Sequence, residues 1–255
     1  MNDLFDLSGR TALITGGSKG LGKAMAASFA SHGADIMICS RHADELASVA
    51  EEIRAATGRR VEYVSADLSD RSHVASVASA ARDHFDGIDI LVNNAGSNHP
   101  QLIDQIEDEA WDEIVQLNLS SCMALSRALV PSMKERGWGR VIYISSIMAM
   151  AAAPARSVYS ATKAGLIGMA RAQALELGDS GVTVNCIAPG PFLTDLPAAK
   201  LTEEQRQLIG QRTALKRWGQ TTELVGPALL LASDAGSYMT GSVVVVDGGI
   251  LANVT

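Results

Sequence analysis

The sequence predicts an α/β fold in which a doubly wound parallel sheet of about seven strands is covered by helices on both faces. Short runs rich in β-branched residues alternate with longer helical patterns along the whole chain. The runs are almost continuously apolar, as expected for parallel strands that are buried on both faces. No repeat, low-complexity tract or linker divides the 255 residues, so we expect a single domain over residues 1–255.

The expected elements follow one another in regular order. Strands are predicted at RTALIT (10–15), ADIMIC (34–39), VEYVS (61–65), IDILVN (88–93), RVIYIS (140–145), VTVNCI (182–187) and VVVV (243–246). Helices are predicted at residues 20–32, 43–57, 70–84, 108–135, 157–178 and 222–233. The alternation has one long break, from Pro189 to about Gln220. An excursion of that length after a strand is typical of a functional lid, which we place at about 190–220.

The bulk composition excludes several classes of protein. The chain is 47% hydrophobic and 19% charged, which indicates a globular protein rather than a disordered one. The net charge of −7 argues against nucleic-acid binding, because neutralising phosphates requires an excess of Lys and Arg. The first ten residues lack the apolar core of a secretory signal, and no apolar run reaches the ~18 residues that cross a membrane. We therefore expect a cytoplasmic protein.

The three cysteines, Cys39, Cys122 and Cys186, are far apart and lack metal-ligand spacing. A disulfide framework or a metal site is therefore not expected. We expect all three to be buried as small apolar side chains.

Glycines gather where the first predicted strand meets the first predicted helix, in TGGSKGLG, Thr15 to Gly22. Glycine lets a backbone approach a phosphate closely, and the amino end of a helix supplies free N–H groups and a partial positive charge. At the carboxyl edge of a parallel sheet this combination is typical of a dinucleotide site. The glycine spacing departs from the usual G-x-G-x-x-G, and a glycine cluster can also be an ordinary turn.

A second candidate motif is YSATK, Tyr159 to Lys163, near the start of the fifth predicted helix. Residues four apart lie on the same face of a helix, so the phenol and the ammonium can converge on one point. Because a nearby cation stabilises a phenolate, the pair can act as an acid and base. By itself, the motif is also an ordinary helix pairing.

Taken together, these motifs resemble those of the short-chain dehydrogenase/reductases. The pattern T-G-x-x-x-G-x-G, the NNAG of Asn93 to Gly96, a Ser thirteen residues before the Tyr, Y-x-x-x-K and P-G-x-x-x-T occur here in the order of that family. The resemblance covers nearly all of the chain and includes gluconate 5-dehydrogenase-like and 3-oxoacyl-carrier-protein-reductase-like members. It implies a Rossmann fold with one dinucleotide-binding and catalytic domain.

The resemblance also implies a set of cofactor-binding residues. These are Gly16, Ser18, Lys19, Gly20, Leu21, Gly22, Ser40, Arg41, Asp67, Leu68, Asn94, Ala95, Gly96, Tyr159, Lys163, Pro189, Gly190 and Thr194. Within this set Asp67 would meet the adenine edge. Alternatively, Asp67 caps the next helix, a role that Ser69 or Asp70 could fill equally well.

The end of the second strand favours NADP(H) over NAD(H). Sites for NAD favour a carboxylate there, which binds the ribose 2′-hydroxyl, whereas a 2′-phosphate requires a cation. No acid occupies this strand end, and Arg41 and Lys19 match positions of the family's NADP-preferring members. The alternative is that both are solvated surface charges.

Four residues are expected to carry the chemistry. By resemblance, Tyr159 is the general acid in carbonyl reduction and the base in alcohol oxidation, and Lys163 assists it and binds the nicotinamide ribose. Ser146 would hold the substrate oxygen; its neighbour Ser145 is the rival, but consecutive strand residues face opposite ways. Asn118 resembles an Asn that kinks the fourth helix and holds a water in a proton relay. Otherwise it is a solvent-facing polar residue.

The substrate is less well defined by the sequence. A sugar acid or a related hydroxy or keto compound is the first expectation, and the polar stretch SNHPQ, Ser97 to Gln101, offers groups that could bind one. A 3-oxoacyl-[acyl-carrier-protein] reductase is the alternative, but such enzymes tend to carry a basic residue where this chain has Asp179 and Ser180 before Gly181. In the lid, Phe192 and Leu196 either line the pocket or belong to a surface helix.

Two further expectations concern partners. A non-catalytic NADP-binding sensor on the same fold is the alternative of another class, although such a protein would be expected to lose the Tyr or the Lys. The apolar last strand resembles the edge through which the family forms homotetramers. It could equally be a strand inside the sheet.

Overall fold

The structure is a computed structural model that describes residues 3–194 and 201–253. These residues form one sheet of seven parallel strands in the order β3-β2-β1-β4-β5-β6-β7. The strands are β1 (Thr11–Thr15), β2 (Asp35–Ser40), β3 (Val61–Ser65), β4 (Ile90–Asn93), β5 (Gly139–Ile144), β6 (Val182–Pro189) and β7 (Val243–Val246). The predicted fold class and all seven predicted strands are confirmed.

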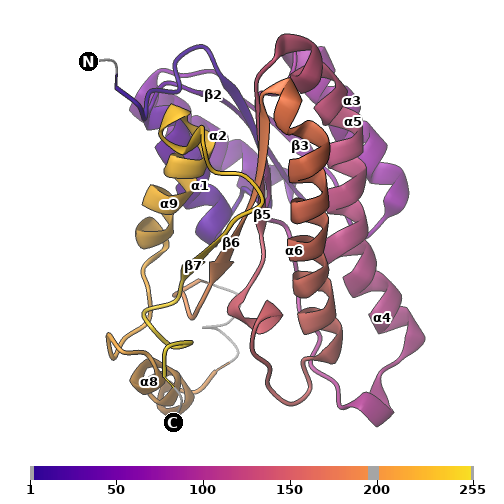
Figure 1. Ribbon diagram of the computed structural model, residues 1–255, viewed down its shortest axis with the longest axis vertical. Helices are drawn as coiled ribbons and strands as arrows, with labels where there is room; N and C mark the ends of the chain where they lie inside the picture. Colours follow the sequence, from indigo (N-terminus) through magenta and orange to yellow (C-terminus); the bar gives the residue numbers. More distant parts are fainter. Residues whose placement is uncertain (1–2, 195–200, 254–255) are drawn as a thin grey trace.

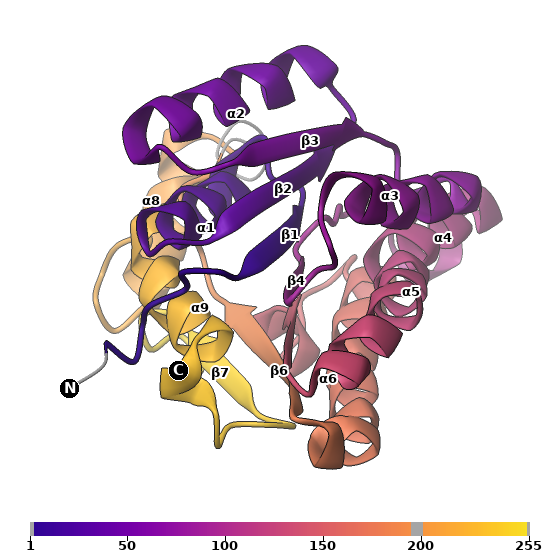
Figure 2. The same ribbon diagram turned by 90° about the horizontal axis from the view of Figure 1, so that it is seen from above.

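Helices cover both faces of the sheet. They are α1 (Gly20–Ser31), α2 (Ala43–Thr57), α3 (Arg71–His84), α4 (Asp108–Val115), α5 (Ser121–Arg136), α6 (Ser157–Leu177), α8 (Glu203–Arg212) and α9 (Val225–Ala232). Figures 1 and 2 show α1, α2 and α9 on one face and α3, α5 and α6 on the other. The inner strands β1, β2, β4, β5 and β6 are buried on both faces because their side chains alternate between two apolar clusters, whereas the edge strands β3 and β7 are partly exposed. In β1, for example, Ile14 packs towards α1 and Leu13 towards α3 and α5.

The direction in which successive strands are added to the sheet reverses between β1 and β4. The chain proceeds from β1 to β2 and β3 on one side, then crosses to β4 and continues to β7 on the other. In open parallel sheets, ligands bind at the carboxyl ends of the strands beside such a reversal. The end of β1 is therefore the expected position of the site.

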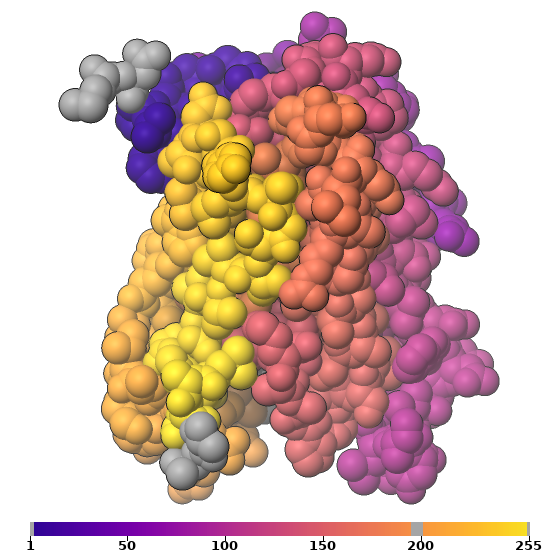
Figure 3. All heavy atoms as spheres, viewed as in Figure 1, coloured from indigo at the N-terminus to yellow at the C-terminus, as the bar shows by residue number. Residues whose placement is uncertain are grey.

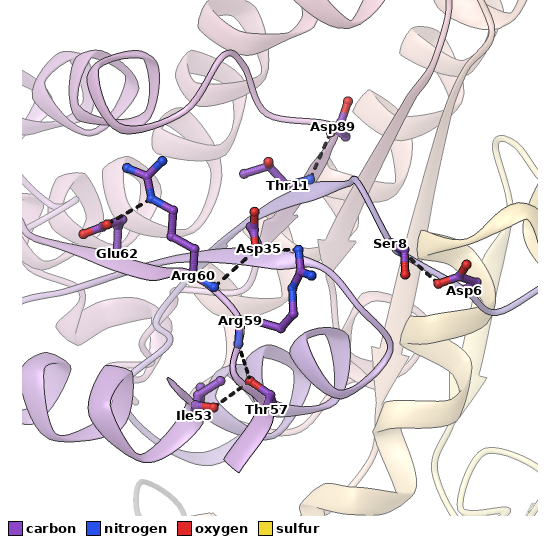
Figure 4. A network of polar contacts seen from close by, with 10 residues as sticks. All are labelled: Asp6, Ser8, Thr11, Asp35, Ile53, Thr57, Arg59, Arg60, Glu62 and Asp89. Atoms are coloured by element: carbon purple, nitrogen blue, oxygen red, sulfur yellow. Dashed lines mark hydrogen bonds and ion pairs between the residues drawn. The ribbon is translucent and has the colours of Figure 1, made fainter. Parts of the chain in front are cut away.

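A network of polar contacts closes the opposite, amino edge of the sheet (Figure 4). The Asp35 carboxylate accepts hydrogen bonds from Arg59 Nη2 at 2.7 Å and from the Arg60 amide at 3.2 Å. The Asp89 carboxylate accepts one from the Thr11 amide at 2.9 Å. Asp35 thus joins the start of β2 to the residues before β3, and Asp89, just before β4, joins that strand to the start of β1.

The predicted fourth helix, 108–135, is not continuous. A π-helical turn, Gln116–Ser120, separates α4 from α5. Single π turns inside α-helices are rare and are often found at functional sites. The apolar period of the sequence does not reveal the turn, because a single extra residue shifts the hydrogen-bond pattern without interrupting the helix.

The lid region and the last helix also differ from the prediction. Residues 203–212 form α8, which was not expected, and the last helix begins with a 3-10 turn at Thr221–Leu224. Leu196 lies outside the described residues. Phe192 lies in no helix, so its surface-helix alternative is wrong. Its side chain is 6% exposed, packs into the apolar cluster of α1 and α9, and lines a pocket with Pro191 and Gly219.

All three cysteines are buried and free, as predicted. Burial raises the pKa of the Cys122 thiol to about 11, so this thiol is protonated near neutral pH. Within residues 3–194 and 201–253, no helix is long and apolar enough to span a bilayer. In the same part of the chain, no group of three His, Cys, Asp or Glu side chains could hold a metal ion.

The cap of α3 decides one alternative for Asp67. Asp70 is the cap, and its carboxylate accepts hydrogen bonds from the Ser72 amide at 2.8 Å and the Ser72 hydroxyl at 2.7 Å. Asp67 instead accepts from the amide and hydroxyl of Ser69 at 3.0 and 2.7 Å. The capping role predicted as an alternative for Asp67 is therefore wrong.

We predict that Asp70→Ala lowers the free energy of unfolding by about 1 kcal/mol, the usual cost of losing an N-cap. Urea unfolding followed by circular dichroism measures this change. Ser76→Ala, on the exposed face of the same helix, is the control. An unchanged unfolding midpoint for Asp70→Ala would contradict the assignment.

Candidate active site

The glycine loop after β1 folds tightly against the start of α1. Gly16 has a φ of 65°, which glycine adopts without strain. A Cβ at Gly22 would lie 2.1 Å from the Gly16 carbonyl oxygen, so only glycine fits there. The N-cap of α1 is Lys19, which makes no side-chain capping bond. The first N–H groups of this helix, including that of Leu21, are thus available to an anion.

Thr15, at the end of β1, ties this loop to the NNAG segment. Its hydroxyl oxygen accepts hydrogen bonds from the amides of Asn94 and Ala95, both at 2.9 Å. The Asn94 side-chain amide donates to the Thr15 carbonyl at 2.8 Å. The ends of β1 and β4 are thereby locked together at the strand reversal. Thr15 was not among the predicted site residues, although its place at the head of the glycine motif was a usable signal.

The end of β2 contributes the groups expected to discriminate between the two dinucleotides. The Ser40 hydroxyl oxygen is buried and has no hydrogen-bond partner among the described residues. Arg41 is exposed and makes no ion pair in the same part of the chain. Lys19, by contrast, is paired: its ammonium lies 2.5 Å from Glu45, in the first turn of α2.

Asp67 and Leu68 follow β3 on the same edge. Leu68 is buried at 4% exposure. Burial opposes ionisation of Asp67, but the hydrogen bonds from Ser69 and the charge of Arg41 hold the pKa of its carboxyl below the usual value. Asp67 is therefore a carboxylate near neutral pH.

Tyr159 and Lys163 lie one turn apart on α6, as predicted. The Lys163 ammonium is 5.6 Å from the centroid of the Tyr159 ring. Lys163 is only 4% exposed, and its ammonium donates a hydrogen bond of 2.8 Å to the Ile144 carbonyl at the end of β5. A buried cation is costly unless it is hydrogen-bonded, so this contact fixes where the charge lies.

Asn118 is buried in the π-helical turn, so the solvent-facing alternative is wrong. Its side-chain oxygen accepts from the Ser97 amide and its nitrogen donates to the Ser97 carbonyl, each at 2.9 Å. The same nitrogen donates to the Thr162 hydroxyl at 3.2 Å. A Cβ at Gly96 would lie 3.1 Å from Asn118 Oδ1 and 3.3 Å from Lys163 Nζ. Asn118, Gly96 and Lys163 are thus brought together.

The two candidate serines behave differently. The Ser145 hydroxyl donates to the Lys163 carbonyl at 2.8 Å and is buried against α6. The Ser146 hydroxyl accepts from the Met148 amide at 3.1 Å, which leaves its proton free to be donated. The structure therefore favours Ser146 as the serine that can meet a ligand.

The PGPFLT segment runs from the end of β6 towards the glycine loop. Gly190 allows close contact with Asp247, since a Cβ there would lie 2.6 Å from the Asp247 Cα. Thr194 lies beside Gly20, where a Cβ would be 3.2 Å from the Thr194 methyl carbon. The Leu193 amide donates a hydrogen bond of 2.9 Å to the Gly219 carbonyl, which joins the two ends of the segment 190–220.

The predicted residues that are described thus gather along one edge of the sheet, at the carboxyl ends of β1, β2, β4, β5 and β6. A nicotinamide dinucleotide fits this edge. The uncapped start of α1 suits a pyrophosphate, the close approach at Gly16 and Gly22 leaves no side chain in its way, and the unpartnered Ser40 hydroxyl suits the adenosine ribose.

Comparisons with known proteins agree with this arrangement. A family model described as enoyl-(acyl carrier protein) reductase matches residues 16–251. The chain belongs to the short-chain dehydrogenase/reductase family. Members of this family interconvert alcohols and carbonyl compounds, so the chain is an oxidoreductase acting on CH–OH and C=O groups.

Three short-chain dehydrogenase/reductases illustrate the similarity. The 3-oxoacyl-[acyl-carrier-protein] reductase of Chlamydia trachomatis is 34% identical over 96% of this chain and 98% of its own length. A structure of L-sorbose reductase from Gluconobacter frateurii, complexed with NADPH and L-sorbose, has a TM-score of 0.93 at 33% identity, covering 99% and 100% of the two chains. A structure of a gluconate 5-dehydrogenase from Burkholderia cenocepacia, in complex with NADP and tartrate, has a TM-score of 0.92 at 32% identity and covers 99% of each chain.

We predict that Thr162→Val lowers the free energy of unfolding by about 1 kcal/mol. Its hydroxyl accepts from Asn118 and donates to the Tyr159 carbonyl at 2.8 Å, and valine has the same shape but cannot make either bond. Urea unfolding measures the change, with Thr162→Ser as the control that keeps the hydroxyl. Equal stability of the Val and Ser variants would show that the contact contributes nothing.

Proposed function

We propose that the chain is an NADP(H)-dependent oxidoreductase that interconverts a secondary alcohol and a ketone on a small polar substrate, and that this substrate is a sugar acid or a related hydroxy or keto compound. The observation that carries the proposal is the pairing of Tyr159 with a buried, hydrogen-bonded Lys163 at the carboxyl edge of the sheet, next to the glycine loop.

Tyr159 is the proton donor and acceptor. During reduction its hydroxyl donates a proton to the carbonyl oxygen, and during oxidation the phenolate takes the proton from the alcohol. The Lys163 ammonium stabilises the phenolate that forms, because the charge is close and shielded from water. When bound, the nicotinamide supplies or accepts the hydride at the carbon of the substrate.

Ser146 holds the substrate oxygen by donating its free proton to it. Asn118 holds the NNAG loop against α6 through its bonds to Ser97 and Thr162, and so positions Lys163. The π-helical turn at Asn118 supports a further role, a water held in a proton relay, because such a turn opens the regular hydrogen bonding of the helix.

The cofactor residues proposed for this chain are those of the glycine loop, the ends of β2 and β3, the NNAG segment, and Pro189, Gly190 and Thr194. Arg41 supports NADP(H), since its exposed and unpaired guanidinium suits a phosphate. Segment 190–220 is proposed as a lid over the substrate, supported by its closed base at Leu193 and Gly219.

A substrate with a carboxylate suits the charges near Tyr159. Residues 141–170, which contain the loop before α6 and most of α6, carry two cations, Arg156 and Lys163, and no Asp or Glu, although the whole chain has a net charge of −7. Arg156 stands immediately before α6, one turn from Tyr159. The similarity to a gluconate 5-dehydrogenase supports the same class of substrate.

We also propose that the protein is a cytoplasmic homotetramer. β7 is the last strand of the sheet, and Val245 on it is 43% exposed. Leu175 on α6 and Tyr238 before β7 are also exposed, and Figure 3 shows the yellow C-terminal residues next to the orange residues of α6. An exposed apolar sheet edge is typical of an interface. Three buried, reduced thiols suit a reducing compartment.

The proposal is tested by following NADPH and NADH oxidation by the purified protein against a panel of carbonyl compounds. The panel contains 5-ketogluconate, other keto sugars and sugar acids, a 3-oxoacyl thioester and a diketone. We expect turnover with a keto sugar acid and NADPH. Turnover restricted to the thioester would replace this function with acyl-carrier reduction, and binding of NADPH without any turnover would favour a non-catalytic sensor.

We predict that Arg41→Ala weakens NADPH binding by about tenfold and leaves NADH binding nearly unchanged, because only NADPH carries the 2′-phosphate. Fluorescence titration of each reduced dinucleotide measures the two dissociation constants. Arg71→Ala, an exposed cation at the start of α3, is the matched control. An equal loss for both dinucleotides would refute the NADP assignment.

A further inference from the structure

The Glu45 carboxylate binds the ammonium of Lys19, the residue that the NADP(H) hypothesis assigns to the 2′-phosphate. One of its carboxylate oxygens lies 2.5 Å from the Lys19 ammonium, and the other accepts a hydrogen bond from the Ser18 hydroxyl at 3.3 Å. Two consecutive residues of the glycine loop are therefore held by one acid from the first turn of α2. The hydrogen bond from Lys19 holds the pKa of Glu45 below its usual value, so this group is ionised near neutral pH.

The Lys19–Glu45 ion pair joins the two segments that would enclose the adenosine ribose, the glycine loop and the chain that follows β2. The Gly17 amide donates to the Cys39 carbonyl at 3.1 Å, which holds the glycine loop against the end of β2. Lys19 follows on the loop, and Arg41 follows on the end of β2. A phosphate that bound the Lys19 ammonium would therefore meet the Glu45 carboxylate.

We propose that Glu45 is a specificity-determining residue that competes with the 2′-phosphate for Lys19 and thereby limits the preference of this chain for NADP(H) over NAD(H). The inference rests on the proposed dinucleotide function. A phosphomonoester carries about −1.5 to −2 charges at neutral pH. To bind it, Lys19 must exchange the carboxylate for the phosphate, and the carboxylate then repels the phosphate.

The same carboxylate favours the dinucleotide without a 2′-phosphate. A ribose 2′-hydroxyl can donate a hydrogen bond to an acid in this region, which is how NAD sites use a carboxylate. In this chain the acid comes from the first turn of α2 rather than from the strand end, where sequence reasoning looked for it and found none. Arg41 favours NADP(H) and Glu45 favours NAD(H), so we expect the chain to bind both.

A second ion pair between α1 and α2 provides a matched control. Lys23 of α1 is paired with Glu52 of α2 at 2.7 Å, again with both side chains partly exposed. This pair joins the same two helices with the same chemistry, but Lys23 lies inside α1, one turn beyond Lys19, and Glu52 lies two turns beyond Glu45 on α2. Loss of the Glu52 carboxylate removes an α1–α2 ion pair without changing the charge beside the ribose.

The test is isothermal titration calorimetry of the full chain with NADP⁺ and NAD⁺, comparing the ratio of the two dissociation constants. We expect Glu45→Gln to shift the ratio about tenfold towards NADP⁺, the size expected when a nearby like charge is removed. Glu52→Gln should leave the ratio unchanged. Lys19→Gln should shift it the opposite way, towards NAD⁺, since the phosphate then meets Glu45 without its counter-charge.

The outcomes separate this inference from the proposed function. Suppose that the wild-type protein binds a dinucleotide. If Glu45→Gln then leaves the ratio of the NADP⁺ and NAD⁺ dissociation constants unchanged, or changes it no more than Glu52→Gln does, the inference is wrong and the oxidoreductase function stands. If wild type binds neither dinucleotide, both are wrong. Titration with 2′,5′-ADP and with 5′-ADP repeats the comparison without the nicotinamide, and a Glu45→Gln gain confined to 2′,5′-ADP assigns the effect to the 2′-phosphate.

Discussion

The burial of the Lys163 ammonium is the constraint around which the reacting side of the site is built. A cation taken out of water is stable only where an acceptor meets it, and here the Ile144 carbonyl does so at the end of β5. Ser145 adds a second bond between the same strand end and helix, from its hydroxyl to the Lys163 carbonyl. α6 is thus fixed to β5 at one position, and Tyr159, one turn earlier, is fixed with it.

The cofactor side is held by neutral hydrogen bonds and by close backbone packing. Thr15 and Asn94 join the ends of β1 and β4, and the glycines let the loop fold onto itself. Lys19, Arg41, Glu45 and Asp67 carry charge at the outer part of this side, where each is partly or largely exposed. The hydrogen-bonded ends of β1 and β4 can therefore position the reacting atoms rigidly. The exposed charged side chains select which dinucleotide binds without changing those strand ends.

The fold was predictable from sequence because each strand is a short apolar run bounded by a helix, and no other arrangement buries such runs on both faces. The spacing of Tyr159 and Lys163 predicted that they share one helix face, but the roles of this pair and of the glycines were predictable only from the resemblance to the short-chain dehydrogenase/reductases. The resemblance also predicted a break of the fourth helix at Asn118, but the π-helical form of that break was not predictable from the apolar period. Glu45, Thr15 and Thr162 were missed because their partners are distant in sequence or are backbone groups. The burial of Phe192 outside any helix was not predictable because the return of the chain at Gly219, which pairs with it, is a tertiary contact.

The measurement that tests the account most directly is the turnover of Tyr159→Phe with the best carbonyl substrate of the wild-type protein, together with its affinity for NADPH. The account predicts a loss of turnover of at least about a hundredfold with nearly normal NADPH binding, because only the proton donor is removed. Tyr63→Phe, at a partly exposed tyrosine of β3, should behave as wild type. A Tyr159→Phe protein that turns over at the wild-type rate would remove the Tyr159–Lys163 pair from the mechanism.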